Sequence, residues 1–138
     1  MNNGVILDTG PLVAFMDRAE KHHAWTCDQF RRFPATLLTC EAVLTEALFL
    51  LRRMPAAQDK LLELVARHAL QPVFRLSDEI ETIRLMHAQY RDLPMSLADA
   101  CLVCLAETTG LPVCTLDSDF TIYRTTGGKA LKLIAPPR

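Results

Sequence analysis

Short apolar runs alternate with amphipathic segments along this chain, and this pattern constrains its fold more than any other sequence feature. Parallel strands need a crossover connection, usually a helix, so the alternation favours a parallel sheet covered on both faces. We therefore expect an α/β fold: a three-layer α/β/α sandwich with a parallel sheet of four or five strands. The runs expected to form strands are residues 5–7, 36–39, 73–76, 112–116 and 131–134.

The segments between these runs have the apolar spacing of helices. Ser77 and Ser96 are expected to cap the helices that follow them, and Gly110 is expected to end the last helix. Pro55 is expected to end the helix before it. The predicted helices are one short and one longer helix within residues 12–33, then about 41–53, 57–69, 78–90 and 96–109.

The length of 138 residues, half of them hydrophobic, suits one domain with a substantial core, so we expect a single domain over residues 1–138. Neither a signal-peptide pattern nor an apolar stretch of membrane-spanning length is found, so the expected location is cytoplasmic. The five cysteines are an odd number, and Cys101 and Cys104 lie within an apolar run. They are expected to be buried, reduced thiols rather than disulfide or zinc ligands.

Four acidic residues lie where strands end or where helices are apolar. Asp8 directly follows the first run and Asp117 the fourth, and ligands of such sheets bind beyond the carboxyl ends of the strands. Glu46 and Asp99 lie in helical segments with apolar neighbours, which suggests that Glu46 projects toward packed surface. An isolated charge there is costly, and no Lys or Arg is adjacent in sequence to any of the four. A bound cation would be a natural partner.

Each acid also has a purely structural interpretation. Asp8, before Thr9-Gly10-Pro11, could form an Asx turn. Glu46 could be an ordinary surface residue, and Asp99 could close a capping box with Ser96. The acids of the turn after the fourth run could simply begin a helix. Taken singly, none of these positions establishes a functional site.

Taken together and in order, the acidic motifs resemble those of the PIN-domain nucleases, most closely the VapC-type toxins of bacterial toxin–antitoxin pairs. The resemblance covers nearly the whole chain. One departure is Gly10, where relatives often carry Ser. The motifs are Ile6-Leu7-Asp8-Thr9 with Leu12-Val13-Ala14 after it, Glu46-Ala47-Leu48, Leu97-Ala98-Asp99-Ala100, and Thr115-Leu116-Asp117-Ser118-Asp119-Phe120.

The resemblance implies a PIN-like α/β/α sandwich that hydrolyses RNA phosphodiester bonds with Mg²⁺ or Mn²⁺. It also implies a cognate antitoxin and a homodimer as partners. Independently, hard cations prefer oxygen ligands, as carboxylates provide. The implied catalytic and metal-binding residues are Asp8, Glu46, Asp99 and Asp117, with Thr9, Thr115 and Asp119 in support.

Two other classes of function remain open. A non-catalytic module could bind RNA or a protein with the same fold, although the complete set of acids speaks against it. A receiver-like signalling domain would need a pair of acids near the first strand and a late Lys, whereas the first strand offers only Asp8. The net charge of −1 excludes a protein that coats duplexes through a basic excess, so contact with RNA would be local.

Overall fold

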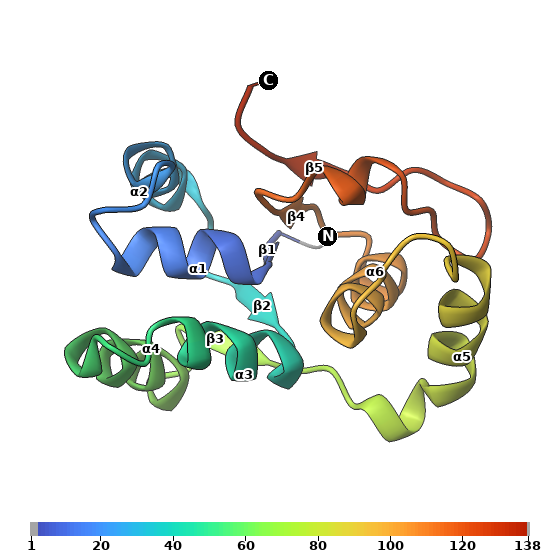
Figure 1. Ribbon diagram of the computed structural model, residues 1–138, viewed down its shortest axis with the longest axis horizontal. Coiled ribbons are helices and arrows are strands. Elements are labelled where there is room, and N and C mark those ends of the chain that lie inside the picture. The colour runs from blue at the N-terminus through green and yellow to red at the C-terminus, as the bar shows by residue number, and fades with distance from the viewer. Residues whose placement is uncertain (1–2, 138) are drawn as a thin grey trace.

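The computed structural model describes residues 3–137 and has a five-stranded parallel sheet at its centre (Figure 1). The strand order is β3-β2-β1-β4-β5, so the order reverses between β1 and β4. This confirms the parallel sheet predicted from the alternating pattern. The strands are β1 (Val5–Leu7), β2 (Leu37–Thr39), β3 (Leu70–Pro72), β4 (Val113–Cys114) and β5 (Leu133–Ile134).

Helices lie on both sides of the sheet, which confirms the α/β/α sandwich. In Figure 1, α1 and α2 lie on one side of β1, and α5 and α6 lie on the other. Helix α3 packs against both α1 and α6. The helices are α1 (Thr9–Met16), α2 (His23–Arg32), α3 (Glu41–Leu50), α4 (Pro55–Ala66), α5 (Ile80–Gln89) and α6 (Leu97–Thr109), with short 3₁₀ helices η1 (Leu76–Asp78) and η2 (Ser118–Thr121).

The core is centred on β1 and α6. Every residue of β1 is buried, and so is most of α6, as the apolar run of residues 100–106 predicts. Cys101 and Cys104 are buried free thiols within this helix. No helix among residues 3–137 is both long enough and apolar enough to cross a membrane.

Both ends of α6 follow the sequence signals. The hydroxyl of Ser96 accepts a hydrogen bond from the backbone N–H of Asp99 at 3.0 Å, which caps the first turn. Gly110 ends the helix with φ of 74°, a left-handed conformation that glycine adopts without strain. The helix that carries Asp99 is therefore fixed at both ends by local interactions.

The predicted strand at residues 73–76 is wrong, because β3 comes earlier, at Leu70–Pro72. Helix α4 ends at Ala66, and His68 takes a left-handed conformation with φ of 62°, which turns the chain into the sheet at Leu70. Leu70 is 1% exposed, whereas Val73 is 47% exposed. A proline can close this strand because β3 lies at the edge of the sheet.

Two predicted helix boundaries also differ from the structure. Ser77 lies inside η1 and does not cap α5, whose preceding residue, Glu79, provides no side-chain cap. Helix α3 ends at Leu50, so Pro55 does not terminate it and instead opens α4. The first position of a helix suits proline because its missing N–H would have no partner there.

Candidate active site

Asp8, Glu46, Asp99 and Asp117 line one pocket of about 450 Å³. They come from the end of β1, from α3, from the first turn of α6 and from the residues after β4. These elements meet where the strand order reverses, which is where open α/β sheets bind ligands. Glu20 and Asp119 also line the pocket, and none of its described lining residues is Lys, Arg or His.

Asp8 is the most buried of the four acids, at 6% exposed. It caps α1: its Oδ1 accepts a hydrogen bond from the backbone N–H of Thr9 at 2.8 Å, and its Oδ2 accepts one from the hydroxyl of Thr115 at 2.7 Å. Burial raises the pKa of Asp8 from 3.8 to about 6, and the charges of Asp99 and Asp117 also raise it. Asp8 therefore acts as a helix cap, not as the start of the Asx turn that the sequence also allowed, and it lies in the pocket at the same time.

Thr115 links the residues that follow β1 and β4 through hydrogen bonds. Its hydroxyl donates to Asp8 and accepts a hydrogen bond from the backbone N–H of Asp117 at 2.9 Å. The Oδ1 of Asp117 accepts from the backbone N–H of Asp119 at 2.9 Å, which shapes the turn before η2. One buried hydroxyl thus positions two of the pocket acids relative to each other.

Glu46 is tied to α1 through Thr9, whose hydroxyl donates to its Oε1 at 2.6 Å. The expectation that Glu46 projects toward packed surface is wrong, because Glu46 is itself exposed. Its neighbours Phe49 and Leu50 are 61% and 51% exposed. Phe49 and Leu50 are thus open to solvent beside Glu46, and Leu50 also lines the pocket.

Asp99 both closes the capping box and faces the pocket. Its Oδ2 accepts hydrogen bonds from the backbone N–H of Ser96 at 3.5 Å and from the hydroxyl of Tyr123 at 2.9 Å. Both of these hydrogen bonds use Oδ2, and neither uses Oδ1. Burial raises the pKa of Asp99, and the charge of Asp117 adds to this effect.

Tyr123 is the site residue that the sequence does not indicate. It is completely buried, and its ring packs edge-on against Tyr90 and Phe120, each at 5.2 Å between ring centroids. Burial raises its pKa, so the hydroxyl stays protonated and donates to Asp99. Asp99 lies 24 residues away in sequence, and no spacing pattern connects the two.

Gly10, the departure from the expected motif, has a packing reason. A Cβ at this position would lie 3.2 Å from three side-chain atoms of Leu116. Leu116 precedes Asp117 and also lines the pocket. A serine at position 10 would therefore require Leu116 to move, so the two residues are matched to each other.

The donor set fits a hard divalent cation. The four acids offer only carboxylate oxygens, and Asp117 and Glu46 each keep an oxygen that accepts no hydrogen bond within residues 3–137. In the same residues, no three Asp, Glu, His or Cys side chains converge closely enough to enclose an ion by themselves. Mg²⁺ suits such a site, because it keeps several waters and binds through one or two carboxylates.

The family model that matches this chain is the PIN domain, over residues 5–125, so the chain belongs to the PIN-domain family and the predicted resemblance is confirmed. Among solved structures, the fold is similar to that of VapC20 from Mycobacterium tuberculosis, a toxin that cleaves the sarcin–ricin loop. The TM-score is 0.78 at 19% sequence identity, over 86% of this chain and 93% of that chain. No curated protein matches the chain.

Proposed function

We propose that this chain is a divalent-metal-dependent endoribonuclease that hydrolyses RNA phosphodiester bonds. The observation that carries the proposal is the pocket itself: a PIN fold in which Asp8, Glu46, Asp99 and Asp117 share one cavity without a basic lining residue. Like charges so close together, one of them buried, are stabilised by a bound cation.

Asp8, Asp99 and Asp117 would hold Mg²⁺ or Mn²⁺, directly or through water, with Glu46 on the other side of the pocket. Binding of such an ion supplies a water of lowered pKa and offsets the negative charge that develops on the leaving oxygen. The raised pKa of Asp8 supports this assignment, since burial raises it and the hydrogen bonds from Thr115 and Thr9 offset only part of that effect.

The surrounding residues keep the acids in place. Thr115 and Thr9 donate to Asp8 and Glu46, and Tyr123 donates to Asp99. Each donor occupies one oxygen of its acid. Glu46 is exposed, so its free oxygen suits orienting the attacking water.

We further propose that the chain is the toxin of a type II toxin–antitoxin pair. The support is the similarity of its fold to VapC20, a toxin that cleaves the sarcin–ricin loop. A cognate antitoxin, a homodimer and a cytoplasmic location belong to the same proposal. The near-neutral charge of the chain agrees with local contact at the pocket.

Asp99→Asn and Asp8→Asn test the assignment. The amide keeps the volume of the side chain and an acceptor oxygen but removes the charge, so we expect a folded protein that does not cleave a labelled RNA in Mg²⁺ or Mn²⁺. Without metal, each variant should be at least as stable as the unmodified chain, because repulsion among the acids is reduced. The control is Asp59→Asn, an acid of α4 outside the pocket.

The outcomes are distinct. Cleavage by the Asp99→Asn variant at the rate of the unmodified chain would leave Asp99 as a helix cap only. RNA binding without cleavage by the unmodified chain, with either metal, would identify a non-catalytic module instead.

A further inference from the structure

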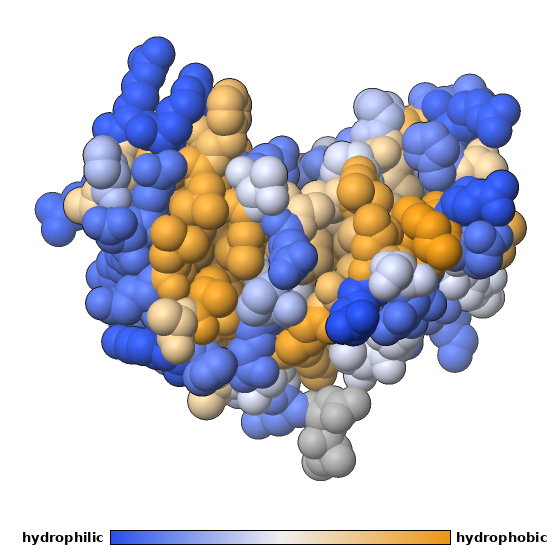
Figure 2. Space-filling view, turned by 90° about the horizontal axis from the view of Figure 1, so that it is seen from below, coloured by the Kyte–Doolittle hydropathy of each residue, from blue (hydrophilic) through white to orange (hydrophobic). Residues whose placement is uncertain are grey.

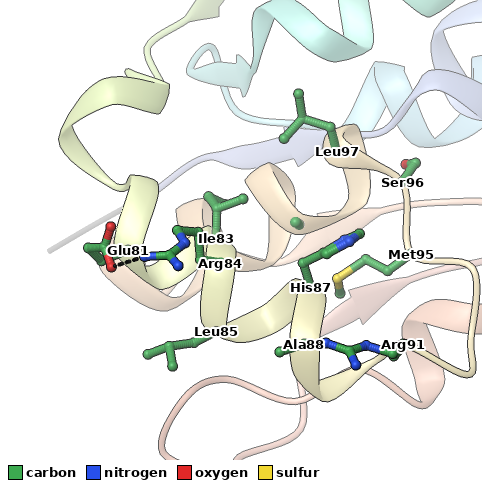
Figure 3. Close-up of a pocket in the computed structure, with 11 residues that line it drawn as sticks. Glu81, Ile83, Arg84, Leu85, His87, Ala88, Arg91, Met95, Ser96 and Leu97 are labelled. Atoms are coloured by element: carbon green, nitrogen blue, oxygen red, sulfur yellow. Dashed lines mark hydrogen bonds and ion pairs between the residues drawn. The ribbon is translucent and has the colours of Figure 1, made fainter.

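A second pocket, of about 670 Å³, is larger than the pocket of the four acids, which we call the carboxylate pocket. Figure 3 shows the residues that line the second pocket. It lies between α5 and the first turn of α6. The two pockets share Ser96, the residue that caps α6. The two pockets therefore meet at the start of α6.

The second pocket has an apolar floor. Ile83, Met95 and Ala100 line it and are buried, whereas Leu85 and Leu97 line it and are 66% and 50% exposed. Concave sites of this size with an apolar lining and a few polar groups are typical of small-ligand binding. The flat face of a nucleobase matches such a lining. Figure 2 shows one face of the molecule, on which apolar areas are divided by polar side chains.

Its rim is basic, in contrast to the acidic pocket beside it. Arg84, His87 and Arg91 project from α5 and the turn after it (Figure 3). Arg84 forms an ion pair with Glu81 at 2.9 Å. Glu81 is the only acid among the described lining residues. Arg91 has no carboxylate partner among residues 3–137, so its guanidinium is available to a phosphate or a base.

We infer that this pocket binds an unstacked nucleotide of the RNA substrate, adjacent to the bond that is cleaved. The base packs on the apolar floor, and Arg91 contacts its phosphate or stacks on its ring. The inference rests on the proposed function and adds a subsite to it. Exposed leucines also suit a protein partner, but the unpaired Arg91 and the continuity with the carboxylate pocket favour a nucleotide.

Binding can be measured without cleavage. The chain is labelled with ¹³C in its methionine methyl groups and titrated in EDTA with AMP, GMP, CMP and UMP. We expect at least one nucleotide to shift the resonance of Met95, in the pocket, and not that of Met54, at the start of α4. Ribose 5-phosphate, which has no base, should leave Met95 unshifted. An equal shift with ribose 5-phosphate would reduce the site to a phosphate contact and overturn the base subsite.

Two variants test the contacts. Ala88→Trp fills the pocket from an exposed position and should abolish the shift of Met95. Arg91→Ala should weaken nucleotide binding about tenfold, the size expected for loss of a charge-assisted hydrogen bond. The control is Arg67→Ala, an exposed arginine paired with Glu63 on α4, which should bind as the unmodified chain does.

RNA binding separates the possible outcomes. In the Asp99→Asn variant, addition of Ala88→Trp should weaken RNA binding about tenfold, because one base loses its stacking surface. If the unmodified chain cleaves RNA but no nucleotide shifts Met95, the subsite is overturned and the proposed function stands. If Ala88→Trp changes the sedimenting mass of the chain, the pocket is a protein interface and the inference is likewise overturned.

Discussion

The carboxyl group of Asp8 has a pKa that is raised by burial, and this makes the stability of the metal-free protein depend on pH. Between its unfolded pKa of 3.8 and its folded pKa of about 6, the folded state binds more protons than the unfolded state. The free energy of unfolding therefore falls as pH rises through this window. A difference of about two pKa units corresponds to about 3 kcal/mol.

The measurement is urea denaturation in EDTA at pH 4 and pH 7. We expect the stability of the unmodified chain, relative to the Asp8→Asn variant, to be lower at pH 7 than at pH 4 by this order of magnitude. An unchanged difference between the two proteins would show that Asp8 is compensated by a group other than a metal.

The hydroxyl of Tyr123 allows a second test, of the hydrogen bond that it donates to Asp99. Its hydrogen bond lowers the pKa of Asp99, so Tyr123→Phe should raise that pKa further. Cleavage should then lose more activity at acidic than at alkaline pH, and the pH–rate profile should move to higher pH. The matched control is Tyr90→Phe, whose hydroxyl accepts from the backbone N–H of Arg124 instead. Identical profiles for the two variants would exclude a positioning role for Tyr123.

Among the structural elements, α6 shows what local sequence signals can determine. Ser96 and Gly110 mark its ends in sequence and in structure, because both act on backbone groups within one turn. The position of β3 shows the opposite case. The turn into it depends on a left-handed His68, and no glycine marks it. The strand itself is selected by pairing with β2, which lies far away in sequence.

The candidate site likewise has one part that the sequence predicts and another that depends on tertiary packing. Asp8 and Asp117 could be placed near each other from sequence, because the ends of parallel strands share one edge of a sheet. The hydrogen bonds from Thr115 to Asp8 and from Tyr123 to Asp99 could not, because they depend on tertiary packing alone. Sequence therefore indicated the acids but not the second, basic-rimmed pocket.

The C-terminal end of α6 can be tested separately from the chemistry. Gly110→Ala meets no neighbouring atom within 4 Å, but it places a side chain on a residue with φ of 74°. We expect a loss of about 1 kcal/mol in the free energy of unfolding with unchanged cleavage. Gly127→Ala is the control, since its nearest atom lies at 3.8 Å and its φ is not left-handed. Equal stability of the two variants would contradict the strain at Gly110.

At the scale of the whole molecule, the core is apolar and contiguous, so folding should not require a metal. Treatment with EDTA should leave the circular dichroism spectrum unchanged and abolish cleavage, which Mg²⁺ or Mn²⁺ should restore. Activity should weaken on acidification, because protons compete with the ion for the carboxylates. Loss of the spectrum in EDTA would reveal a structural metal, and undiminished cleavage in EDTA would remove the metal from the proposal.

The bond between Thr115 and Asp8 spans 107 residues, and it closes the pocket only when β4 pairs with β1. Asp8 is synthesised early, but it gains its neighbours in the pocket only after Asp99, Thr115 and Asp117 have been synthesised. A nascent chain in which β4 has not yet left the ribosome therefore has no assembled cluster of acids, and we expect it to have no cleavage activity. Fragments that end before β4 should be inactive for the same reason.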